Sequence, residues 1–182
     1  MSKSLTSKIA LVTGGNRNIG RETALALAAL GADVLITYRA QQDSAAQTVK
    51  DLQALGVRAA ALQVDLTGTA QLPAFVERFQ AQLVAWGRKD FDILVNNAGT
   101  LRIATFDKVT EDDLDTTFAT NYKSVFFLTQ RLHGLLADNG RIVNLGSGTA
   151  RIAFGPLVSY GPLKAALQSL TLYLASFLGS RG

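Results

Sequence analysis

Short apolar runs alternate with longer amphipathic segments along the whole chain. The apolar runs, each of a length typical of a β-strand, are residues 8–13, 33–38, 59–64, 91–96 and 141–145. The segments with helical spacing of apolar residues are 19–30, 44–55, 71–86, 111–136 and 159–178. Strands that are nearly all apolar belong in a sheet covered on both faces, and strands alternating with helices form parallel crossovers. The pattern predicts one α/β domain over residues 1–182: a doubly wound parallel sheet of about five strands with helices on both faces.

Composition narrows the possible ligands. The chain has 182 residues, 48% hydrophobic and 18% charged, which is enough for one substantial core. It has no cysteine, and its single histidine, His133, has no second ligand nearby, so we expect no metal site. The net charge of +4 is scattered without a basic run, which argues against nucleic-acid binding. No stretch reaches the roughly 18–20 apolar residues of a membrane span, and no signal core is visible. We expect a cytoplasmic protein that binds a small anionic ligand and no membrane.

A glycine-rich loop, Thr13-Gly-Gly-Asn-Arg-Asn-Ile-Gly20, joins the first strand to the first helix. Glycines in such a loop let backbone amides approach a pyrophosphate, and the helix N-terminus adds positive potential. A tight strand–helix turn is the alternative, but the strand before, the helix after and the position at the start of an alternating chain favour dinucleotide binding. The loop residues expected to contact the cofactor are Gly14, Asn16, Arg17, Asn18, Ile19 and Gly20.

The end of the second strand indicates which cofactor. An NAD site usually has an acidic residue there, which binds the ribose 2′-hydroxyl. This chain has Thr37-Tyr38-Arg39 instead, with Arg17 in the glycine loop. Because guanidinium groups bind phosphate oxygens in a bidentate manner, the pair favours the 2′-phosphate of NADP(H). The alternative is that both arginines are solvated surface residues.

Tyr160 and Lys164 are four positions apart at the start of the last predicted helix, so they share one face. A nearby ammonium favours the phenolate and would lower the tyrosine pKa from its usual value near 10. Ser147, which follows the fifth strand, offers a hydroxyl that could hold a substrate oxygen. Although a Tyr-Lys pair alone often marks only a surface contact, its place after a strand of an open α/β sheet favours carbonyl reduction or alcohol oxidation.

Taken together, these motifs resemble the classical short-chain dehydrogenases/reductases over essentially the whole chain. The resemblance implies a Rossmann fold and a set of roles: Tyr160 as proton donor, Lys164 as its partner and a ligand of the nicotinamide ribose, and Ser147 as a second substrate contact. It also implies that Asn121 holds a water of a proton relay. Further cofactor contacts implied by the family pattern are Asp65 with Leu66, and Asn97, Ala98 and Gly99.

Three features depart from the family pattern. Asn18 replaces a loop glycine, although asparagine tolerates a left-handed backbone better than most residues. Pro162 falls between Tyr160 and Lys164, which fixes a helix start near Tyr160. The sequence ends at Gly182, whereas the family continues through a substrate-covering segment. We therefore expect residues 1–182 to lack that lid, and either to be the front part of a longer reductase or to receive the missing strands from another source. By themselves they should bind NADPH weakly at best and show little turnover. Residues 141–145 would then form an exposed apolar edge strand.

The function that follows is an NADPH-dependent oxidoreductase that acts on a ketone or a secondary alcohol. A dinucleotide-binding scaffold without turnover is the alternative, because the lid is absent. The sequence does not identify the substrate. Arg102 and Arg151 lie in residues 100–103 and 148–154, the two loops expected to border the substrate pocket. They could bind an anionic substrate, but they could equally be solvent-exposed loop arginines. The helix at 159–178 is apolar on more than one face, so it needs cover from a second chain unless other parts of the same chain supply it. The resemblance implies that this helix and the helix at 111–136 pair across a two-fold axis, which predicts a homodimer or homotetramer.

Overall fold

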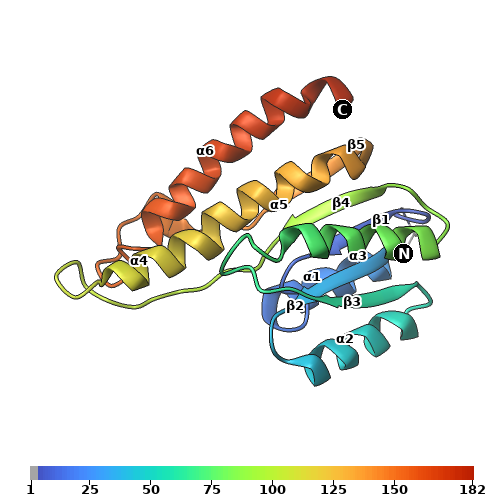
Figure 1. Ribbon diagram of the computed structural model, residues 1–182, viewed down its shortest axis with the longest axis horizontal. Helices are drawn as coiled ribbons and strands as arrows, with labels where there is room; N and C mark the ends of the chain where they lie inside the picture. Colours follow the sequence, from blue (N-terminus) through green and yellow to red (C-terminus); the bar gives the residue numbers. More distant parts are fainter. Residues whose placement is uncertain (1–3) are drawn as a thin grey trace.

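The computed structural model describes residues 4–182 as five strands with helices between them (Figure 1). The strands are β1 Ile9–Val12, β2 Asp33–Tyr38, β3 Ala59–Gln63, β4 Phe91–Asn96 and β5 Leu136–Asn144. The α-helices are α1 Asn18–Ala29, α2 Gln42–Ala54, α3 Leu72–Ala85, α4 Glu111–Phe118, α5 Ser124–Leu132 and α6 Gly161–Leu178. The short turns are η1 Ala119–Lys123, η2 His133–Leu135, η3 Gly148–Ala150 and η4 Gly179–Arg181.

All four strand pairings are parallel, in the order β3-β2-β1-β4-β5. The chain moves outward from β1 through β2 to β3 and then crosses to β4 on the other side of β1. This reversal leaves a crevice at the carboxyl ends of β1 and β4, where open α/β sheets bind their ligands. The predicted doubly wound parallel sheet is confirmed.

Two apolar layers enclose the sheet. On one face α1 and α2 pack against β1, β2 and β4 through residues such as Ala24, Leu52 and Ile36. On the other face α3 and α5 bury a larger cluster that includes Phe75, Phe79 and Leu128. Helix α6 packs on α5 through Val125, Leu167 and Leu170, and the two helices run side by side in Figure 1. None of the helices in residues 4–182 is long and apolar enough to cross a membrane.

The long helix predicted at 111–136 is interrupted, which corrects that prediction. After α4 the backbone forms a π-turn, η1, and continues as α5 only to Leu132. The π-turn adds only one residue, and the segments before and after it each keep the helical spacing of apolar residues, so the pattern did not locate the extra residue. Beyond η2, the backbone is already strand-like at Leu136, which pairs with Phe91.

The fifth strand also differs from the prediction of 141–145. β5 spans Leu136–Asn144, and its register against β4 shifts between Phe91 and Ile93. Asn139, which lies between the two registers on β5, has a left-handed φ of 59°. Within the described residues β5 is an edge strand, and Val143 is 47% exposed. Helix α6 begins at Gly161, with Tyr160 at its N-cap and Pro162 in its first turn, so the predicted start near Tyr160 is confirmed.

Candidate active site

The glycine loop depends on two unusual backbone positions. Asn18 has a φ of 49°, so asparagine takes the left-handed conformation expected for it. At Gly20 even a methyl group would collide with the Gly14 carbonyl oxygen and the Asn97 side-chain nitrogen. The loop is thus folded tightly against the end of β4, with the N-terminus of α1 directed into the crevice. This arrangement brings backbone amides and the helix dipole to one place, as an anionic ligand requires.

Hydrogen bonds tie this loop to the ends of β2 and β4. The Thr13 hydroxyl accepts from the backbone N–H groups of Asn97 and Ala98, both at 3.0 Å, and donates to the Val95 carbonyl oxygen. The Asn97 side chain donates to the Thr13 carbonyl oxygen at 2.8 Å. On the other side, the Gly14 N–H donates to the Thr37 hydroxyl at 3.0 Å. The three loops therefore form one connected rim.

Helix α2 supplies a support that the sequence did not suggest. The hydroxyl groups of Ser44 and Thr48 donate to the Asn16 carbonyl oxygen at 2.6 and 3.3 Å. Asn16 itself is 7% exposed. Because no local motif links residues separated by about thirty positions, only the fold could show that α2 holds the glycine loop in place.

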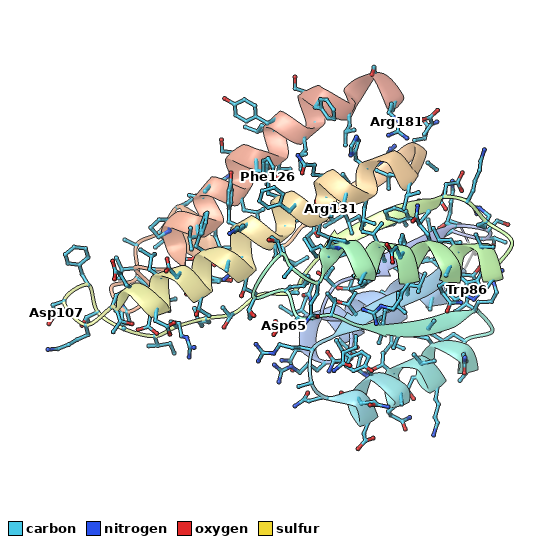
Figure 2. All side chains as sticks on the ribbon, in the orientation of Figure 1. Asp65, Trp86, Asp107, Phe126, Arg131 and Arg181 are labelled. Atoms are coloured by element: carbon cyan, nitrogen blue, oxygen red, sulfur yellow. The ribbon has the colours of Figure 1, made fainter. Side chains whose placement is uncertain are left out.

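An open groove of about 450 Å³ runs along this rim. It brings together the predicted cofactor residues of four different segments, namely Gly14, Asn16, Arg17, Asn18, Ile19, Gly20, Arg39, Asp65, Leu66, Asn97, Ala98 and Gly99. Figure 2 shows Asp65 and Trp86 at opposite ends of α3, with Asp65 at the end that faces the groove. Within residues 4–182, neither Arg17 nor Arg39 forms an ion pair, and both are exposed.

Asn121 lies in the π-turn behind this groove and is completely buried. Its side-chain nitrogen donates to the carbonyl oxygens of Thr100 at 2.8 Å and Thr117 at 3.0 Å. Its Oδ1 has no hydrogen-bond partner, and a Cβ added at Gly99 would lie 2.7 Å from that oxygen. A buried amide oxygen without a partner is uncommon, and it offers an acceptor for a water or a ligand group at the site.

Ser147, Tyr160 and Lys164 lie near the carboxyl end of β5, and none of the three is among the residues that line the groove, although Tyr160 and Lys164 were also predicted to contact the cofactor. The Lys164 side chain is 4% exposed, and its Nζ donates to the Leu145 carbonyl oxygen at 2.7 Å. Leu145 in turn donates its N–H to Asn96 at the end of β4. The lysine therefore connects the start of α6 to the two strand ends that border the crevice.

The pKa shifts of Tyr160 and Lys164 differ from those expected from the sequence. Burial raises the pKa of Tyr160, and a hydrogen bond with Ser147 acts in the opposite direction. Burial also lowers the pKa of Lys164. We expected Lys164 to lower the pKa of Tyr160; instead its Nζ lies 5.4 Å from the centre of the phenol ring and is bonded to a backbone carbonyl. The phenol is therefore held in its protonated form.

No group of three or more histidine or acidic side chains in residues 4–182 is arranged to hold a metal ion.

Comparison with known proteins identifies the family. The sequence profile of the short chain dehydrogenases matches residues 8–182. The chain belongs to this family. A short-chain dehydrogenase/reductase from Pestalotiopsis microspora is 34% identical over 97% of this chain and 65% of its own length. A hydroxynaphthalene reductase-like protein from Metarhizium brunneum is 36% identical over 98% of this chain and 66% of its own length. The chain thus spans about two thirds of the length of these relatives.

Solved structures of the family agree closely with the fold. The landomycin C-6 ketoreductase LanV, with bound NADP and rabelomycin, is 38% identical and has a TM-score of 0.95 over 99% of this chain and 74% of its own. A short chain dehydrogenase from Burkholderia cenocepacia, in complex with NADP, is 42% identical and has a TM-score of 0.91 over 98% of this chain and 71% of its own.

Proposed function

We propose that this chain forms the cofactor-binding and proton-transfer part of an NADP(H)-dependent oxidoreductase that reduces a ketone or, in reverse, oxidises a secondary alcohol. The observation that carries the proposal is the contact of Lys164 with the Leu145 carbonyl oxygen at the end of β5, which links Tyr160 and Ser147 through Asn96 to the strand end that borders the groove. A site with a protonated phenol and a neighbouring serine hydroxyl suits the transfer of a proton to a carbonyl oxygen.

The groove fits a dinucleotide phosphate. The glycine loop and the N-terminus of α1 would hold the pyrophosphate, because Gly20 lets the backbone approach closely. Arg17 and Arg39, which have no ion-pair partners in the described residues, would bind the 2′-phosphate. Asp65 and the backbone at residues 97–99 would line the remainder. When bound, NADPH supplies the hydride, and the protein contributes position and electrostatics.

Proton transfer is the task of the side chains at β5 and α6. Tyr160, whose pKa burial raises, is protonated at neutral pH and donates its proton to the oxygen of the reduced substrate. Ser147 orients that oxygen by a second hydrogen bond. Lys164, held at the Leu145 carbonyl oxygen, stabilises the phenolate that remains and binds the cofactor ribose. The unpartnered Oδ1 of Asn121 accepts from a water that returns a proton from solvent.

A bulky aromatic ketone is the substrate class that we propose. The two loops that flank the site expose apolar side chains: Ile103 is 74%, Phe106 84%, Ile152 64% and Phe154 59% exposed. The loops are joined by the Ala104 N–H, which donates to the Pro156 carbonyl oxygen at 2.9 Å. Figure 2 shows Asp107, next to Phe106, in the loop that projects beyond α4. Support also comes from the relatives, which include a hydroxynaphthalene reductase-like protein and a ketoreductase with bound rabelomycin.

The assembly that we propose is a homodimer or homotetramer formed through α4, α5 and α6. Leu172, Tyr173 and Phe177 on α6 are 73%, 75% and 69% exposed, so no other part of the described chain covers them. Apolar side chains gathered on one exposed helix face are typical of a protein–protein contact.

The proposed activity is tested by following NADPH oxidation with a panel of aromatic ketones. We expect the full-length protein to oxidise NADPH only when a ketone is present. Tyr160→Phe should abolish this activity and leave NADPH affinity within a few fold, whereas Tyr173→Phe, an exposed tyrosine of the same helix, should behave like the wild type. Retention of most of the rate in Tyr160→Phe would refute the proton-transfer role. NADPH binding without ketone-dependent oxidation would favour a scaffold.

A further inference from the structure

Thr149 contacts the serine of the proton-transfer site at two atoms. It lies in η3, two residues after Ser147. The Thr149 hydroxyl donates to the Ser147 Oγ at 2.8 Å, and the Thr149 backbone N–H donates to the same oxygen at 3.2 Å. Both distances are within the normal range of hydrogen bonds. Ser147 therefore receives two donors from a single neighbouring residue.

This pattern fixes the direction of the serine hydroxyl. A serine oxygen has two lone pairs and one hydrogen. Because Thr149 occupies both lone pairs, the hydrogen of Ser147 is left to be donated to a third group. Tyr160 is the neighbouring hydroxyl to which we assign this hydrogen, because it directly precedes Gly161, which packs on Thr149, and because its interaction with Ser147 acts to lower its pKa. With this assignment, the hydrogen bonds run from Thr149 to Ser147 and from Ser147 to Tyr160.

The turn that carries Thr149 is held against the helix that carries Tyr160. A Cβ at Gly161 would lie 2.9 Å from the Thr149 carbonyl oxygen, so the absence of a side chain at Gly161 permits this contact. Gly161 is the first residue of α6 and directly follows Tyr160. The donor at one end of the chain of hydrogen bonds and the acceptor at the other are therefore fixed relative to each other by backbone packing.

We propose that Thr149 is a positioning residue that holds Ser147 as a hydrogen-bond donor toward Tyr160 and the substrate oxygen, an inference that rests on the proposed function. Before the substrate arrives, the serine donates its one hydrogen to Tyr160, and it can redirect this hydrogen to the carbonyl oxygen when the substrate binds. Hydrogen bonds in such a chain also polarise one another, so the Thr149 hydroxyl strengthens the donor at Ser147. Without it, the serine hydroxyl can turn toward other acceptors.

The test measures the titration of Tyr160 in the absence of substrate. Tyrosine labelled with ¹³C at Cζ reports the ionisation of each phenol, and the Tyr160 signal is the one missing in Tyr160→Phe. In Thr149→Val, which removes the hydroxyl and keeps the shape, we expect the Tyr160 pKa to rise by roughly half a unit to one unit. Thr149→Ser, which retains a hydroxyl, should restore the wild-type titration.

A double substitution separates this role from a merely structural one. In a Ser147→Ala background, Thr149→Val should leave the titration of Tyr160 unchanged, because the route through Ser147 is already lost. In the active protein, the pH profile of kcat/KM should shift in the same direction as the phenol titration, with the KM for NADPH unaltered. Thr149→Ala gives a second hydroxyl deletion if valine disturbs the turn.

Several results would overturn the proposal. One is a Thr149→Val protein whose Tyr160 titrates as in the wild type, or a Thr149→Ser protein whose Tyr160 does not. Another is an equal shift of the Tyr160 pKa when Thr149→Val is made in the Ser147→Ala background. Loss of the fold in both Thr149→Val and Thr149→Ala would also overturn it. The titration needs no turnover, so it can be carried out even if the protein reduces no ketone. Failure of the proposed function and failure of this inference are therefore distinguishable.

Discussion

The side-chain nitrogen of Lys164 donates a hydrogen bond to the carbonyl oxygen of Leu145 at 2.7 Å. This contact joins the first turn of α6 to the residue that follows β5, and it satisfies an amine that is almost completely buried. Because the nitrogen lies 5.4 Å from the centre of the Tyr160 ring, the lysine acts on the phenol across a gap and not through a direct hydrogen bond. The strand end thus determines where the positive charge of the site is placed.

Burial of Lys164 predicts a dependence of stability on pH. Since burial lowers the pKa of Lys164, the unfolded chain binds this proton more tightly than the folded chain. The free energy of unfolding should therefore rise with pH between the folded-state pKa and the usual lysine value near 10.4. Lys164→Met should remove this rise, whereas Lys50→Met, an exposed lysine on α2, should keep it. Urea unfolding between pH 7 and pH 10 provides the measurement, and parallel pH curves for wild type and Lys164→Met would contradict the prediction.

Arg39 should control the choice between cofactors. We expect NADPH to bind more tightly than NADH, by the roughly 1.5–3 kcal/mol of a hydrogen bond to a charged group. Arg39→Asp should erase or reverse this preference through repulsion of the 2′-phosphate. Lys89→Asp makes the same change of charge before β4, at the opposite end of the sheet, and should leave the preference intact. Fluorescence titration measures the affinities for NADPH and NADH. Equal affinities for the two cofactors in the wild type would mean that Arg17 and Arg39 are only solvated.

The folded sheet should weaken in acid because of Asp92. This carboxylate is 5% exposed and accepts from Lys8 Nζ at 2.8 Å and from the Ile9 N–H at 2.9 Å. Burial by itself raises the pKa of Asp92, but these bonds together with Arg88 outweigh it and hold the pKa below its usual value. The stabilisation is therefore complete above pH 4 and is lost as the pH falls through the folded-state pKa.

Substitution of Asp92 tests that contribution directly. Asp92→Asn should lower the free energy of unfolding at pH 7 by roughly 1–3 kcal/mol, because charged hydrogen bonds to Lys8 and Arg88 are lost. Asp115→Asn, an exposed aspartate on α4, should change it by no more than about 0.5 kcal/mol. The difference between the two variants should shrink on acidification below pH 4. An Asp92→Asn protein as stable as the wild type at pH 7 would rule out this account.

The exposed face of α6 should determine assembly. Tyr173→Asp places a charge in the proposed contact and should convert an oligomer to a monomer, as measured by light scattering at micromolar concentration. Val84→Asp introduces the same charge at a site that is 71% exposed on α3 and should leave the oligomer unchanged. A monomeric wild-type protein at that concentration would overturn the prediction.

The sequence predicted the sheet and the groove well, because both depend on local patterns. Apolar runs gave the strands, and the segment between Thr13 and Gly20 showed both the turn and its position before α1. The start of α6 followed from Pro162. The residue types at Ser147, Tyr160 and Lys164 are the basis on which we propose a proton-transfer site, and that role stays a prediction.

What the sequence could not show depends on contacts between distant segments or on small changes of backbone geometry. The helix break at η1 and the register shift at Asn139 leave no periodic signal. The direction of the Tyr160 pKa follows from burial and from the orientation of Lys164, neither of which spacing alone reveals. Likewise, the support that Ser44 gives to Asn16 exists only because α2 folds back onto the loop.

The π-turn at Ala119–Lys123 has a consequence for how this chain can tolerate insertions and deletions. A π-turn contains one residue more than an α-helical turn, and such turns occur frequently at functional sites. Loss of a single residue within it would restore a regular α-helix and rotate everything that follows by about 100°. If the helix after the deletion kept its place, Asn121 would lose its contacts with Gly99 and Thr100. If the part before the deletion kept its place, Leu128 and Leu132 would rotate out of the hydrophobic core. Natural length variants of this protein should therefore have their gaps in the exposed loops and never in this helix.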